Sequence, residues 1–249
     1  MRLRVFARVF TKTHLFTFLA ASNSRWKHRL FILQRITAKS FYKLLGKKNY
    51  SLQPHQFFSI KPGYHHATSV EQFDDTLFTD EWQKDVYALA ASLAREFKYR
   101  TILDIGCGSG YKLVNMLQQY DTTGIEVEPT FSWLQQKYPN RKWLLFDDAE
   151  PANLTADLVI CADVIEHIDN PDDMMDFLAD INFRQCIIST PERDAVAGKN
   201  DYGPPENTTH YREWNAIEFK NYVRGWLYVQ EQRIFDGKST AQVLICNKK

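Results

Sequence analysis

Residues 101–110 read TILDIGCGSG and contain the turn that decides the fold. The apolar residues of 101–105 predict a short buried strand, and three glycines follow at every second position. Glycine lets the backbone approach a ligand closely and adopt φ values that a Cβ disfavours. Because a helix is predicted directly behind the turn, over Lys112–Gln119, its free N–H groups suit a carboxylate or phosphate. The stretch therefore predicts a strand–turn–helix unit that binds a ligand at the turn.

The alternation of strand and helix continues on both sides of this unit. Helices are predicted over Trp82–Phe97, Lys112–Gln119, Phe131–Tyr138, Met174–Ala179 and Trp214–Val223, and strands over Thr101–Ile105, Thr122–Val127, Lys142–Phe146, Asp157–Cys161, Gln185–Thr190, Trp226–Phe235 and Thr240–Cys246. Such alternation indicates a parallel sheet covered on both faces, and Asp236-Gly237 between the last two strands is a hairpin signal. The expected fold class is α/β, with a Rossmann-like, mostly parallel seven-stranded sheet that ends in a C-terminal antiparallel hairpin.

An acidic residue, Glu126, ends the second predicted strand. A carboxylate at this place in an α/β sheet can accept hydrogen bonds from both hydroxyls of a ribose. The glycine spacing is G-x-G-x-G, not the G-x-G-x-x-G of dehydrogenases. Together these features resemble class I S-adenosylmethionine-dependent methyltransferases, and the resemblance covers about residues 102–219, roughly half of the chain.

The resemblance implies which residues bind the cofactor, S-adenosyl-L-methionine. Asp104 is expected to fix the loop and the methionine amino group, Glu126 the ribose, and Asp148 the adenine amino group, with Asp147 as the competing register. The implied set is Asp104, Gly106, Cys107, Gly108, Ser109, Gly110, Glu126, Val127, Asp148, Ala149, Ala162 and Asp163.

A second group of polar residues follows the fourth predicted strand. Residues 163–171, DVIEHIDNP, resemble the D-V-I/L-E-H segment of methyltransferases similar to ubiquinone-biosynthesis O-methyltransferases, with Glu166 and His167 beginning the next helix. Residues 189–191, STP, and 210–214, HYREW, resemble small-RNA 2′-O-methyltransferases and bacterial sugar-pathway methyltransferases. The resemblance to the small-RNA enzymes implies a divalent metal such as Mg²⁺, held by Asp163, Glu166, His167 and His210. Asp163 stands where a longer glutamate is usual.

The same side chains also suit catalysis without a metal. Histidine titrates near neutral pH and can take the proton of a hydroxyl, so His167 and His210, with Glu166, are the catalytic candidates for O-methylation. Methyl transfer from a sulfonium is otherwise driven largely by alignment. Two purely structural interpretations stay open. Glu166 caps its helix or pairs with Arg212, and His167 bonds only to a backbone carbonyl.

Charge and composition divide the chain. Residues 1–70 hold 13 lysines and arginines and no acid, which leaves 18 basic and 30 acidic residues for the remainder. We expect a basic amphipathic arm over residues 1–50, a segment covering the substrate over 51–80, and a methyltransferase domain over 81–249. The arm has three interpretations besides a solvated or packed helix: contact with a membrane surface, organellar targeting and contact with nucleic acid. The four cysteines are scattered, and the sequence has no apolar stretch of about 20 residues, which favours a cytoplasmic protein. Any contact with a membrane is expected to be peripheral.

The acceptor is less defined than the cofactor. Tyr50–Thr79 and Arg193–His210 are expected to cover it, and their likeness to the sugar-pathway group favours a small polar molecule such as a saccharide or a lipid-linked precursor. An RNA 2′-O-methyltransferase is the first alternative, although the acidic body makes a nucleic acid partner unexpected. An NAD-dependent oxidoreductase and a cofactor-binding scaffold without catalysis are the others.

Overall fold

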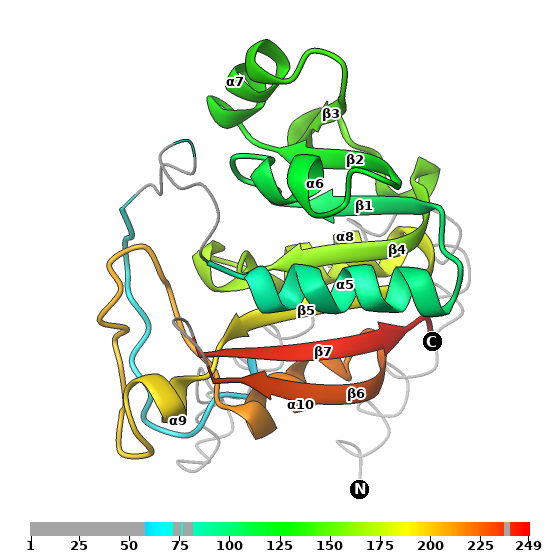
Figure 1. Ribbon diagram of the computed structural model, residues 1–249. Helices are drawn as coiled ribbons and strands as arrows, with labels where there is room; N and C mark the ends of the chain where they lie inside the picture. The colour runs from blue at the N-terminus through cyan, green and yellow to red at the C-terminus, as the bar shows by residue number, and fades with distance from the viewer. Residues whose placement is uncertain (1–57, 72–75, 77–81, 237–239) are drawn as a thin grey trace, which may run out of the picture. The chain divides into compact units, whose positions relative to one another are not determined.

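The computed structural model of the protein describes residues 58–71, 76, 82–236 and 240–249. Its centre is a seven-stranded sheet with the order β3-β2-β1-β4-β5-β7-β6, shown in Figure 1. The strands are β1 (Thr101–Ile105), β2 (Asp121–Glu126), β3 (Lys142–Leu145), β4 (Thr155–Ala162), β5 (Asn182–Pro191), β6 (Tyr228–Phe235) and β7 (Ala241–Asn247). The first five pair in parallel, and β7 runs antiparallel to both β5 and β6. The predicted fold class is confirmed.

Helices cover both faces of the sheet because successive side chains of each buried strand point to opposite faces. The longer helices are α5 (Lys84–Glu96), α7 (Thr130–Lys137), α8 (Pro171–Asp180) and α10 (Ala216–Val223), and the shorter ones are α6 (Tyr111–Asn115) and α9 (Arg193–Val196). Leu158 and Ile160 of β4 pack in the core cluster that includes α5, whereas Val159 and Cys161 pack in the cluster that includes α8 and α10. Figure 1 shows α5 on one side of the sheet and α8 and α10 on the other.

One local prediction is wrong. Glu166 and His167 do not begin a helix. They lie on the 3-10 turn η4 (Ile165–His167), and α8 begins only at Pro171. The physical reason is Asn170-Pro171: the residue before a proline is disfavoured in the helical conformation, and Asn170 is extended. Glu166 and His167 are therefore carried on a short turn at the carboxyl end of β4.

The segment 58–71 and the loop after α9 lie side by side at the edge of the sheet where the parallel strands end (Figure 1). Backbone hydrogen bonds join His65 N–H to Tyr202 O, Ala67 N–H to Tyr211 O and Glu71 N–H to Thr208 O. At Gly203, φ is +63°, and an added Cβ would lie 2.3 Å from the carbonyl oxygen of His65, so this approach requires glycine. The two expected covering segments thus contact each other.

Three expectations fall partly or wholly outside the described residues: the basic arm 1–50, much of the 51–80 segment, and Gly237 of the hairpin turn. Among the described helices, none has the length and apolar character needed to cross a membrane.

Candidate active site

The glycine turn after β1 packs tightly against neighbouring side chains. Gly106, Gly108 and Gly110 all have positive φ, between 53° and 69°. A Cβ on Gly106 would lie 2.5 Å from Val164, and one on Gly110 would lie 2.7 Å from Trp143. Real Cβ contacts are not that short, so the turn depends on glycine at these positions.

Glu126, at the end of β2, faces this turn. Its carboxylate accepts hydrogen bonds from the N–H of Gly108 and from the N–H of Val127, both at 2.8 Å. The residue is only 7% exposed. The acid predicted to hold a ribose is thus fixed against the glycine turn, at the carboxyl edge where open α/β sheets bind ligands.

Asp104 lies beneath the same turn and is fully buried. The Tyr87 hydroxyl of α5 donates to its Oδ2 at 2.8 Å, while Oδ1 has no hydrogen-bond partner among the described residues. Burial raises the pKa of Asp104 from 3.8 to about 7, although the Tyr87 hydroxyl and Lys112 oppose that rise. This carboxyl therefore changes its charge near neutral pH.

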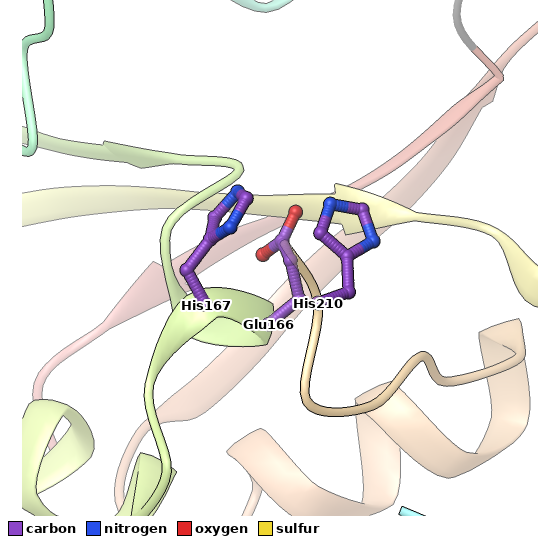
Figure 2. Close-up of side chains that lie close together, drawn as sticks. All are labelled: Glu166, His167 and His210. Carbon is purple, nitrogen blue, oxygen red and sulfur yellow. The ribbon is translucent and has the colours of Figure 1, made fainter. Parts of the chain in front are cut away.

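Glu166, His167 and His210 meet beyond the end of β4. Ligand-type atoms of the three residues lie within 4.8 Å of one another, and Figure 2 shows the Glu166 carboxylate between the two imidazole rings. His167 and His210 pack edge to face, with ring centroids 4.6 Å apart. His210 reaches this place on the loop that follows α9, far from Glu166 in the sequence.

Hydrogen bonds define the tautomers of both histidines. His167 Nδ1 lies 2.9 Å from Thr209 O, and His210 Nδ1 lies 2.7 Å from the carboxylate of Glu213. Because a carbonyl and a carboxylate only accept, Nδ1 carries the proton in each ring and Nε2 keeps its lone pair. The Nε2 atom of His210 is 3.0 Å from Asn207 Nδ2, which donates to it. Burial and the neighbouring His210 lower the pKa of His167 to about 4, so this imidazole ring is neutral at pH 7.

Glu166 has no exposed surface, and apart from its own backbone N–H and the Thr190 hydroxyl no described residue donates a hydrogen bond to its carboxyl group. Burial raises its pKa well above the usual range, and Asp163 adds to that effect. The expected pairing of Glu166 with Arg212 is wrong, because the Arg212 guanidinium donates to the carbonyl oxygens of Ile168 and Asp169. His167 does bond to a backbone carbonyl, as one of the structural interpretations of this residue predicted.

Asp163 does not join this group. It has φ +53°, and its carboxylate accepts a hydrogen bond from Ser189 Oγ at 2.6 Å. Burial raises its pKa, while the hydrogen bonds from Ser189 and Gln83 lower it. Of the four predicted metal ligands, the structure therefore brings together Glu166, His167 and His210 only.

A cavity of about 550 Å³ opens next to these residues. The ends of β4, β5 and β7 and the loop after α9 line it, with Trp82 on a further side. The polar residues that line it, among those the structure describes, are Asp163, Asp201, Glu206, Asn207, His210, Glu213 and Thr240. The cavity thus connects the end of β4 with His210.

Comparison with known proteins agrees with this arrangement. The sequence model of one family, described as a methyltransferase domain, matches residues 78–232. The chain belongs to this methyltransferase family. It is an S-adenosylmethionine-dependent enzyme, and the alternatives of an NAD-dependent oxidoreductase and of a scaffold without catalysis are wrong. A search of curated proteins found no similar sequence.

Solved structures share the fold of this methyltransferase. Magnesium protoporphyrin IX methyltransferase from Synechocystis PCC 6803, with bound S-adenosylhomocysteine, is 18% identical and superposes with a TM-score of 0.51 over 69% of this chain and 89% of its own. An S-adenosylmethionine-dependent methyltransferase from Clostridium acetobutylicum ATCC 824 is 12% identical, with a TM-score of 0.52 over 68% and 93%. These likenesses support the class I fold.

The region expected to hold adenine lies on the 3-10 turn η2 (Phe146–Asp148) after β3. Both Asp147 and Asp148 are exposed, so the structure does not choose between them. The N–H of the buried Ala149 donates to Phe146 O at 3.1 Å, so that N–H already has a partner. Ala162 is the buried last residue of β4.

Sequence reasoning missed four residues that this site uses. Gln83 precedes α5 with φ +65° and donates to Ala162 O, and Tyr87 bonds to Asp104. Glu213 and Asn207 hold the two nitrogens of His210. Aromatic and amide residues in the first turn of the helix before the glycine strand were the available signal, whereas nothing in the sequence marked Asn207.

Stability should depend on pH through Asp104. A carboxyl group whose pKa is raised on folding binds more protons in the folded protein than in the unfolded one. Its contribution to the free energy of unfolding therefore falls as the pH rises from about 4 to about 7. Asp104→Asn removes this effect. We expect urea unfolding at pH 8 to show the variant more stable than wild type by up to about 4 kcal/mol, with a much smaller difference at pH 4. Asp85→Asn, an exposed acid on the same helix as Tyr87, is the control. Equal effects of Asp104→Asn at both pH values would contradict the prediction.

Proposed function

We propose that this methyltransferase methylates a hydroxyl oxygen of a small polar acceptor, such as a saccharide or the sugar of a lipid-linked precursor. The observation that carries the proposal is the cavity that joins Asp163, at the end of β4, to His210. A cavity of this volume suits a small ligand, and a histidine on its wall suits removal of a hydroxyl proton.

The cofactor would lie over the glycine turn. The positive φ values at Gly106, Gly108 and Gly110 give a tight turn whose backbone a ligand can approach closely, and Glu126 is in position to accept from ribose hydroxyls. Asp104, ionised above about pH 7, is the proposed partner of the methionine amino group. S-adenosylmethionine supplies a methyl group on a positively charged sulfur, and the chain aligns it with the acceptor.

His210 is the proposed base. Glu213 accepts from its Nδ1–H, which fixes the tautomer and stabilises the imidazolium that forms when Nε2 takes a proton. Asn207 now donates to Nε2, but its side chain is exposed, so an acceptor hydroxyl can replace it there. The Tyr64 hydroxyl accepts a hydrogen bond of 3.0 Å from the backbone N–H of Glu213. This bond anchors the His210–Glu213 pair to the 58–71 segment.

A divalent metal is the second proposal for the same residues. A fully buried carboxyl group between two imidazole rings fits a cation chemically. Two imidazoles with one carboxylate suit manganese, iron or zinc better than Mg²⁺, which prefers oxygen ligands. The metal would hold the acceptor oxygen near the transfer site. Calorimetric titration of Mn²⁺ and Zn²⁺ into the protein tests this, with Glu166→Gln expected to abolish binding; no heat for either ion would contradict it.

The role of His210 is testable with labelled methyl transfer. Wild-type protein is given methyl-labelled S-adenosylmethionine with hydroxyl-bearing small molecules and, separately, with RNA oligonucleotides. We expect label in a small molecule, and His210→Ala to lower that rate about 100- to 10,000-fold without changing the affinity for S-adenosylhomocysteine. His65→Ala, an exposed histidine of the 58–71 segment, is the matched control. Label in RNA alone would overturn the proposal in favour of the RNA alternative.

A further inference from the structure

We infer that the acceptor carries a protonated amine and presents no phosphate or carboxylate to the cavity. The inference rests on the proposed function, because it takes the cavity beside His210 as the acceptor site. It names the charge of the acceptor, which the proposed function leaves open.

The described wall of the cavity is acidic. Asp163, Asp201, Glu206 and Glu213 line it, and no lysine or arginine does among the described residues. Glu166 is fully buried between His167 and His210 and is not part of this wall (Figure 2). The charged groups that an anionic acceptor would meet on this wall are therefore mostly acids, and His210 is the one basic side chain among its described residues.

Nearby cations do not balance these acids. Among the acids of this wall, Glu213 pairs with His210 at 2.7 Å, and Asp201 Oδ2 lies 3.8 Å from Arg193 Nε. The same guanidinium pairs with Glu218 at 2.8 Å and with Asp194 at 3.5 Å, so one positive charge is shared among three carboxylates. Glu206 is exposed and forms no hydrogen bond or ion pair with any described residue. Glu206 therefore gives the cavity an unpaired negative charge that a bound ammonium would neutralise.

Trp82 adds a surface that binds cations. Its side chain lines the cavity and is 51% exposed, which is unusual for so large an apolar ring. The face of an indole attracts an ammonium group, and more so where water is displaced. A tryptophan facing acids suits an amino sugar or another amino alcohol, whose hydroxyl takes the methyl group while its ammonium sits among the carboxylates.

Charged nitroxides measure this field without knowledge of the acceptor. Two nitroxide probes are compared, the cation 3-aminomethyl-PROXYL and the anion 3-carboxy-PROXYL. Each is added to the full chain saturated with S-adenosylhomocysteine, and the paramagnetic relaxation of the backbone amides of Ala197, Asn207 and Thr240 is measured. We expect the cation to enhance the relaxation rates of these amides at least about threefold more than the anion does. Glu206→Gln should reduce the ratio, whereas Glu150→Gln, an exposed acid on the turn after β3, should not. A ratio at or below one overturns the inference and leaves the proposed function standing.

The transfer assay supplies the second arm. Hydroxyl compounds are pooled as ammonium-bearing, neutral and phosphorylated, and we expect at least tenfold more label in the first pool than in the third. Label confined to the neutral or phosphorylated pool overturns the inference alone. Failure of the protein to bind S-adenosylhomocysteine would instead overturn the enzyme's proposed site.

Discussion

Replacing Arg193 by methionine is expected to lower the free energy of unfolding by about 3 to 5 kcal/mol, because it leaves buried carboxylates without their cation. Arg193 has no exposed surface, and its guanidinium holds Glu218 by two hydrogen-bonding contacts of 2.8 and 3.1 Å. It also donates to Glu213 O at 3.2 Å. Arg193 therefore joins the loop that lines the cavity to α10.

Urea unfolding provides the measurement, and the chain provides a matched control. Arg233 pairs with Glu231 at 2.6 Å, but both side chains are more than 40% exposed. Exposed pairs contribute about 0 to 1 kcal/mol, so Arg233→Met should have little effect. Adding Glu218→Gln to Arg193→Met should recover part of the loss, since the amide keeps hydrogen bonding but removes the unpaired charge. A loss in Arg193→Met no larger than in Arg233→Met would contradict the expectation.

Replacing Glu126 by alanine is expected to weaken S-adenosylhomocysteine binding about 10- to 100-fold. The carboxylate positions the turn through Gly108 N–H and, as proposed, accepts from the ribose, and hydrogen bonds to a charged group are worth about 1.5 to 3 kcal/mol. A change of 1.4 kcal/mol is tenfold in the dissociation constant. Isothermal titration calorimetry measures the affinity directly.

Asp121→Asn is the control for Glu126→Ala. Asp121 begins the same strand, and its exposed carboxylate pairs with Lys142 at 2.7 Å, at the end of the sheet far from the glycine turn. Its variant should bind S-adenosylhomocysteine as wild type does. Undiminished affinity in Glu126→Ala would show that the ribose is held elsewhere, and tight binding of NADH by the wild type would contradict the cofactor assignment.

The sequence by itself determined the sheet, the glycine turn and the place of Glu126 beside that turn. Strand β1, the glycine turn and Glu126 form a local unit, and their apolar runs and glycine spacing follow from what buried strands and close backbone turns require. The glycine motif together with Glu126 also indicated a methyltransferase, which the family match confirmed. Asp104 was found by its place before the glycines, but its raised pKa depends on Tyr87 and on burial under α5.

Only the tertiary structure decided the acceptor side. His210 lies on an irregular loop, where no hydrophobic period fixes the path, and backbone hydrogen bonds to the distant segment 58–71 hold that loop in place. Whether Glu166 meets His210, and whether Asp163 joins them, depends on these long-range contacts and on the φ of +53° at Asp163. Local sequence encodes the hydrophobic periodicity of strands and helices and the residues that turns require. The grouping of charged side chains, in contrast, arises only when separate segments pack together.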